Sequence, residues 1–189
     1  MKTKLLLIVL ALFVTTACSG EPPATVTVTP PSSASKAPAG PDAKTVAWLD
    51  GMCGAIYGYM KASNDYASKQ RSGTEVTRNA LKEELGIRAG FAGKAVDELT
   101  ALPPSPIPGG DTVRKSLVDQ YTAARDAANT GKQRLEKSGN SAAMDAAIQA
   151  MDATQKPITE TPDLMPALKI DTQDLMAAAA EAKKCAAPH

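Results

Sequence analysis

Apolar residues recur with the period of an α-helix from Lys44 onward, and this periodicity constrains the fold more than any other feature. In residues 44–68 they fall at i, i+3, i+4, i+7 and i+11, on one face of a first helix: Leu49, Met52, Cys53, Ile56 and Met60. A second helix, capped by Thr74 and ending near Ala101, would carry a similar stripe: Leu81, Leu85, Ala92, Val96 and Leu99.

Prolines and glycines divide the rest of the chain. Residues 102–110 (LPPSPIPGG) must end the second helix, because proline has no N–H group and clashes with the preceding turn. Asp111 is predicted to open a third helix that closes at Gly139, with the stripe Val113, Leu117, Tyr121, Ala124 and Ala128. Ser141 begins a fourth that ends before Pro157, with Met144, Ala147, Ile148 and Met151 on one face. A last helix is expected from Asp171 to Cys185.

The composition favours an all-α fold. Alanine, the best helix former, supplies much of the apolar content, aromatic residues make up 4% of the chain, and residues 44–189 contain no alternating β-branched run. This length suits one domain. Several amphipathic helices with short connections predict an up-and-down helical bundle of four to five helices.

Residues 1–17 have the layout of an export signal peptide. Lys2 and Lys4 give a basic start, residues 5–14 are apolar, and small residues precede Cys18. An apolar run of about ten residues is too short for a bilayer, which needs about 20. We therefore expect export of the chain and no permanent transmembrane helix in this segment.

The tetrapeptide Thr15-Thr16-Ala17-Cys18 resembles a bacterial lipobox, although Thr15 stands where an aliphatic residue is commoner. The resemblance implies that Cys18 begins the mature protein and carries a diacylglycerol, often with a further acyl chain on the new amino terminus. Two or more chains anchor a protein stably. The alternative, ordinary cleavage after Ala17, would expose a reactive thiol outside the cytoplasm. We expect a lipid anchor in the cell membrane, with the protein on the extracytoplasmic face.

Residues 18–43 are rich in Pro, Ser, Thr and Ala and are predicted to form a disordered tether, since they offer little apolar surface to bury.

Without Lys2 and Lys4 the mature chain would carry 19 basic and 20 acidic side chains. Such a balance provides no basic excess to bind nucleic acid. The partners expected are the membrane, through the anchor, and an envelope protein, glycan or lipid.

With Cys18 committed to lipid, Cys53 and Cys185 remain. In an oxidising compartment an even number of cysteines favours a disulfide. A redox or metal pair is the alternative, but no CxxC motif accompanies these residues. A disulfide between the first and last helices would close nearly the whole domain and stabilise it by about 5 kcal/mol in the chain-entropy model.

Residues for catalysis are scarce. His189 is the only histidine and the last residue, so triad and zinc-site patterns lack their usual members. The pairs Glu83–Glu84 and Asp97–Glu98 are interpreted as solvated helix faces, because a di-metal carboxylate site would also need Glu-x-x-His. We expect no catalytic residue, no metal and no cofactor.

Two features are candidate binding surfaces. Gly86, Gly90 and Gly93 share one helix face, opposite the leucine stripe, and each costs about 1 kcal/mol relative to alanine. They indicate a helix break at Gly86, close packing of another backbone, or a shallow groove. Trp48, Tyr57 and Tyr59 cannot all share the Leu49 face, so they indicate either core and rim packing or exposed recognition residues.

The lipobox, the Thr/Pro tether, the LPPSPIPGGD loop and the two cysteines together resemble the small secreted helical lipoproteins of actinobacteria. That resemblance implies an architecture and no assigned chemistry. The leading hypothesis is a non-catalytic binding or interaction module of the cell envelope. A carrier of a small apolar ligand such as a lipid is the alternative, and a carboxylate-dependent hydrolase is a third hypothesis.

Overall fold

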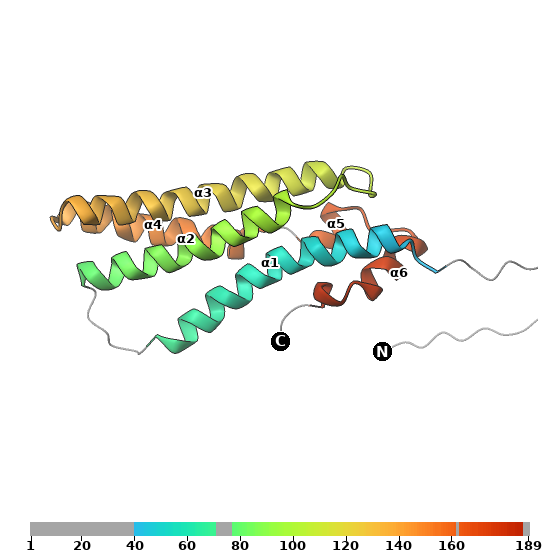
Figure 1. Ribbon diagram of the computed structural model, residues 1–189, viewed down its shortest axis with the longest axis horizontal. Coiled ribbons are helices and arrows are strands. Elements are labelled where there is room, and N and C mark those ends of the chain that lie inside the picture. Colours follow the sequence, from blue (N-terminus) through green and yellow to red (C-terminus); the bar gives the residue numbers. More distant parts are fainter. Residues whose placement is uncertain (1–39, 71–76, 162, 187–189) are drawn as a thin grey trace, which may run out of the picture. The chain divides into compact units, whose positions relative to one another are not determined.

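The computed structural model describes residues 40–70, 77–161 and 163–186, and all regular secondary structure in these ranges is helical. The long helices are α1 (Ala43–Lys69), α2 (Arg78–Thr100), α3 (Gly110–Lys137) and α4 (Ser141–Thr159); the short ones are α5 (Leu164–Ala167), α6 (Gln173–Glu181) and the 3₁₀ turn η1 (Lys183–Cys185) (Figure 1). The all-α prediction is confirmed. The signal peptide, Cys18, most of the tether and His189 lie outside the described residues.

Side chains cap most of these helices by accepting a hydrogen bond from a backbone N–H that has no partner within the helix. Asp42 accepts from Thr45 N at 3.0 Å, Asn140 from Ala143 N at 2.9 Å and Thr172 from Leu175 N at 3.3 Å. The pKa of Asp42 is lowered, first by the hydrogen bond from the Thr45 side chain. α2 is capped by Thr77, so the prediction of Thr74 as its cap was wrong.

Two other boundaries differ from the prediction. α3 begins at Gly110, and its N-cap, Gly109, has a left-handed backbone (φ 79°) that suits glycine; Asp111 lies in the first turn and is not the cap. α4 continues through Pro157 to Thr159, because the ring of this proline is buried and packing offsets its lost hydrogen bond.

The last predicted helix is interrupted. Instead of running from Asp171 to Cys185, α6 covers Gln173–Glu181 and is followed by a 3₁₀ turn, since Ala182 has an extended backbone (ψ 93°). This break turns the chain so that η1 and α6 both pack against α1.

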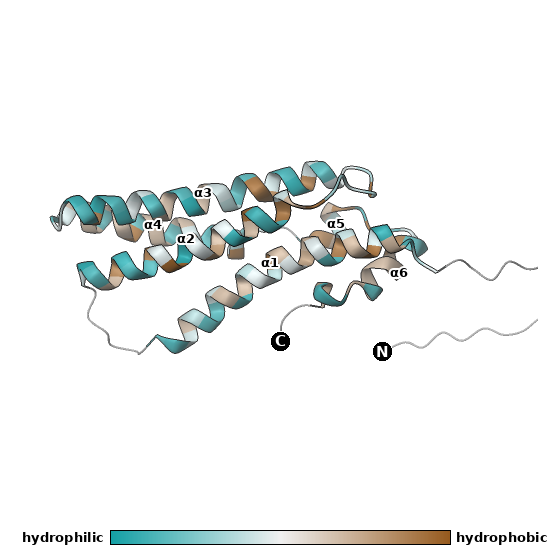
Figure 2. Ribbon diagram, in the orientation of Figure 1, coloured by the Kyte–Doolittle hydropathy of each residue, from teal (hydrophilic) through white to brown (hydrophobic). Residues whose placement is uncertain are grey.

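The interior consists of two apolar clusters. The larger one joins the N-terminal two thirds of α1 to α2, α3, α5 and α6, and includes Leu49, Met52, Cys53, Ile56 and Leu99. The smaller one lies between α2, α3 and α4 and contains no α1 residue. α1 diverges from α2 toward its C-terminal end (Figure 1), and hydrophobic residues concentrate in its first half (Figure 2).

The predicted stripes are buried for the most part. Met60, Val96, Val113, Met144 and Met151 are only half-buried, and Ile148 is 48% exposed, so its assignment to the core face of the fourth helix was wrong. Small residues form that face instead: Ala143, Ala147, Ala150 and Thr154. They let α3 approach closely at Gly131, where a Cβ atom would lie 2.6 Å from the Cβ of Ala150. No described helix is both long and apolar enough to cross a membrane.

Candidate functional site

The connection between α2 and α3, residues 101–109, is a proline-rich loop that packs onto α1. The Leu102 side chain lies over Gly51, where a Cβ atom would come within 2.4 Å of Leu102 Cδ2. Ile107, at the far end of the loop, is 3% exposed. These two apolar side chains attach both ends of the loop to the large cluster.

Polar groups of neighbouring helices fix the loop between these anchors. The Pro103 carbonyl accepts hydrogen bonds from Trp48 Nε1 at 3.2 Å and from Arg114 Nη1 at 2.9 Å. Asp111 Oδ1 accepts from Ser105 N at 3.1 Å and lies 2.9 Å from Arg114 Nη2. The loop conformation is therefore determined by α1 and α3 as well as by its own prolines.

Gly110 permits the closest contact of this site. A Cβ atom there would lie 2.1 Å from Ser105 Oγ and 3.0 Å from Trp48 Cη2. Ser105 Oγ in turn accepts a hydrogen bond from Ile107 N at 3.0 Å. The glycine thus allows the indole of Trp48 and the side chain of Ser105 to pack against the start of α3.

A surface groove of about 500 Å³ results from this arrangement. Trp48, 1% exposed, lies at its base, and the other lining residues are exposed: Lys44, Ala47, Pro103, Pro104 and Pro106. Lys44 is the only charged residue among them. The groove is mainly apolar and its walls are held in place before any ligand arrives, two properties of binding sites.

Trp48 is the only one of the three predicted aromatic residues in this groove. Tyr59 is 3% exposed and donates its hydroxyl to the Thr154 carbonyl of α4, and Tyr57 is half-buried. Tyr59 packs edge to face on Tyr121 with ring centroids 4.9 Å apart. Burial raises the pKa of both tyrosines above the ordinary value of 10.0. Trp48, Tyr57 and Tyr59 therefore do not form one exposed recognition surface.

The glycine face of α2 packs against no backbone. α2 runs unbroken through Gly86, and a Cβ atom at Gly86 or Gly93 would meet only the side chains of Lys132 and Arg125, at 3.6 Å and 3.7 Å. A Cβ atom at Gly90 would have nothing within 4 Å. Of the three predicted explanations, the break and the close backbone contact are wrong; a shallow polar depression does lie beside Gly86, between Lys82, Glu83 and Lys132.

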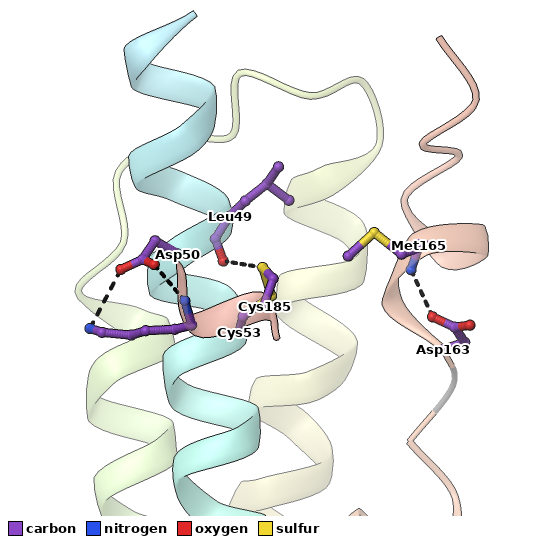
Figure 3. Close-up of a disulfide and its surroundings, with 7 residues drawn as sticks. Leu49, Asp50, Cys53, Asp163, Met165 and Cys185 are labelled. Atoms are coloured by element: carbon purple, nitrogen blue, oxygen red, sulfur yellow. Dashed lines mark hydrogen bonds and ion pairs between the residues drawn. A yellow bond between two sulfur atoms is a disulfide. The ribbon is translucent and has the colours of Figure 1, made fainter. Parts of the chain in front are cut away.

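The disulfide joins α1 to η1. Cys53 is fully buried, and Cys185 brings η1 onto α1, with an S–S bond between the two residues as predicted (Figure 3). Asp50 Oδ1 accepts from Lys184 N at 2.8 Å, and Lys184 Nζ lies 3.6 Å from Asp50 Oδ2. Both cysteines are thus engaged in a covalent link that fixes the C-terminal turn.

The acidic pairs form no cluster. Glu84 accepts two hydrogen bonds from Arg88, which is 7% exposed, so Glu84 is the partner of a buried cation and not merely a solvated residue. Glu98 lies 3.7 Å from Lys94 on an exposed face. Within the described residues no group of three or more His, Cys, Asp or Glu side chains could hold a metal ion.

Comparison with protein-family models, with curated proteins and with solved structures gave no match. The groove must therefore be interpreted from its own geometry. Its loop residues were not among the predicted site residues, although four prolines within six positions were the available signal.

Proposed function

We propose that this protein is a lipid-anchored, non-catalytic binding module of the cell envelope, displayed on the extracytoplasmic face of the membrane, and that the groove at Trp48 and the prolines is its binding site. The observation that carries the proposal is the fixed conformation of the exposed proline loop. Arg114, Asp111 and Trp48 hold it, while its proline rings remain at the surface. Ordered loops on a rigid scaffold commonly carry function.

The location rests on two observations. The lipobox-like residues before Cys18 favour an acyl anchor, and the disulfide suits an oxidising compartment. We place the chain with the small secreted helical lipoproteins that it resembles, with α1–α4 as an up-and-down bundle.

Cys18→Ser should release the protein from the membrane or leave its precursor uncleaved. Fractionation and intact-mass measurement would show either result. An unmodified Cys18 in soluble wild-type protein would contradict the anchor.

The carrier hypothesis retains one supporting observation. A volume of about 500 Å³ falls within the range of small-ligand sites. Against it, the exposed walls leave the groove open on one side, whereas carriers enclose most of an apolar ligand. We therefore favour a macromolecular partner.

Site-specific crosslinking on intact cells tests the binding proposal. A photoreactive residue at Pro104, in the groove wall, is compared with one at Gln149, an exposed position of α4. We expect one reproducible adduct from position 104 and not from 149. The same adduct from both positions, or none from 104, would show that the groove is not the binding site.

A further inference from the structure

We infer that the groove binds a proline-rich segment of a partner protein in the polyproline II conformation, with an acidic side chain of that segment over Lys44. The inference rests on the proposed function and specifies the ligand of the same site.

The walls offer few hydrogen-bonding groups to a ligand backbone. Pro103, Pro104 and Pro106 have no N–H, and the Pro103 carbonyl already accepts from Trp48 and Arg114. A partner β-strand needs a row of free backbone donors and acceptors, so strand addition is not supported. The backbone N–H and C=O groups of a suitable ligand must therefore form their hydrogen bonds with water or within the ligand, and not with these walls.

A polyproline II segment meets this requirement. It has no internal hydrogen bonds, its backbone stays hydrated, and it loses little conformational entropy on binding. Its ring and apolar surfaces can pack on the groove while its carbonyls face water through the open side, which the exposed Ala47, Pro104 and Pro106 leave accessible. A ligand that is buried on all sides would need a closed pocket, whereas this groove is open on one side.

Lys44 adds selectivity for charge. Its ammonium group makes no ion pair within 4 Å in the part of the chain that the structure describes. Asp42, its nearest acidic neighbour in the chain, accepts hydrogen bonds from Thr45 N and Thr45 Oγ1 as the cap of α1, and the Lys44 charge also helps to lower the Asp42 pKa. A cation with no close ion pair beside an apolar surface favours a segment in which an acidic residue adjoins prolines.

The test uses the acylated full chain in detergent micelles, with the indole ¹⁵N–H resonance of Trp48, the only tryptophan, as the probe of the groove. The ligands are capped nonapeptides with three repeats of Pro-Pro-Glu, Pro-Pro-Gln or Pro-Pro-Lys. We expect a saturable shift with Pro-Pro-Glu. Lys44→Glu should weaken that binding about fivefold, the size expected of one exposed ion pair, and should reverse the preference toward Pro-Pro-Lys.

Lys132→Glu, in the separate polar depression beside Gly86, is the control and should leave the affinities unchanged. The inference is overturned if no peptide produces a saturable shift, or if Lys44→Glu and Lys132→Glu have equal effects. A laurate titration distinguishes a wrong ligand from a wrong binding site. Saturable binding of laurate at Trp48 without peptide binding would refute the peptide ligand and leave the groove as a binding site, whereas the cell crosslinking above tests the site itself.

Discussion

The indole N–H of Trp48 donates a hydrogen bond to the carbonyl of Pro103, 3.2 Å away and 55 residues further along the chain. This bond connects the second turn of α1 to the proline loop between α2 and α3. Trp48 is therefore a core residue that positions a surface loop, and it contributes to the proposed binding site without being exposed itself.

Replacing Trp48 with phenylalanine removes the N–H donor and retains most of the ring. We expect the free energy of unfolding to fall by about 1–3 kcal/mol, since the carbonyl keeps Arg114 as a partner but the ring is smaller. Hydrogen exchange at Ser105 and Ile107 should accelerate more than exchange in α4. Equal acceleration throughout the domain would show that Trp48 does not act on the loop specifically.

Gly131 and Gly90 form a matched pair of helical glycines. Gly90→Ala should raise the free energy of unfolding by about 0.5–1 kcal/mol, because the new Cβ atom meets open space and alanine favours the helix. Gly131→Ala should lower it, because its Cβ atom would lie 2.6 Å from that of Ala150. Urea unfolding of both variants checks this; stabilisation by both would contradict the close approach of α3 and α4.

These glycines illustrate what the sequence could predict. Helical periodicity located the helices and most buried residues, because apolar spacing depends on local geometry alone. It singled out Gly86, Gly90 and Gly93, but the glycines at the closest contacts are Gly51, Gly110 and Gly131. Which glycine faces a neighbouring helix depends on tertiary packing, and no local pattern contains that information.

The candidate site shows the same limit. Trp48 was selected as an aromatic residue, and the prolines were recognised only as a helix stop. Trp48 and the prolines form one groove because Arg114 and Asp111 of α3 bind the loop that precedes this helix. These contacts depend on the tertiary structure. The disulfide was predictable, in contrast, because only one pairing is left once Cys18 is assigned to the expected lipid anchor.

Reduction of the disulfide should destabilise the C-terminal segment first. Cys185→Ser would release η1 from α1 and leave Cys53 as a buried thiol, with an expected loss of about 2–5 kcal/mol. Hydrogen exchange should increase in α6 and η1 before it increases in α2 and α3. If α6 keeps its protection in this variant, the disulfide is not what holds the C-terminal turn.

The buried tyrosines predict a loss of stability at alkaline pH. Burial raises the folded-state pKa of Tyr59 and Tyr121, so the unfolded chain releases these protons first as the pH rises above about 10. The contribution is fully present below that pH and is lost above it. Urea unfolding between pH 9 and 11 should show a smaller decline for Tyr121→Phe than for wild type; identical slopes would refute the assignment.

Tyr59→Phe and Tyr121→Phe should differ at neutral pH. The Tyr59 hydroxyl donates to the Thr154 carbonyl, and its loss should cost about 1 kcal/mol or more. The Tyr121 hydroxyl is buried and makes no hydrogen bond of full geometry among the described residues, although the Thr161 side chain is close enough to offset part of the rise in its pKa that burial causes. Its removal should therefore cost less than removal of the Tyr59 hydroxyl. The same urea titrations compare the two variants, and a larger cost for Tyr121→Phe would contradict this assignment.

The most direct test of the binding site combines the crosslinking residue at position 104 with a substitution that fills the groove. Ala47→Trp places a large side chain in the groove, and Ala123→Trp places one on an exposed face of α3. The measurement is the yield of the position-104 adduct on intact cells, with equal amounts of each variant at the membrane. The account predicts that Ala47→Trp abolishes the adduct and that Ala123→Trp preserves it; an adduct that persists with Ala47→Trp, or is lost equally with both, would contradict it.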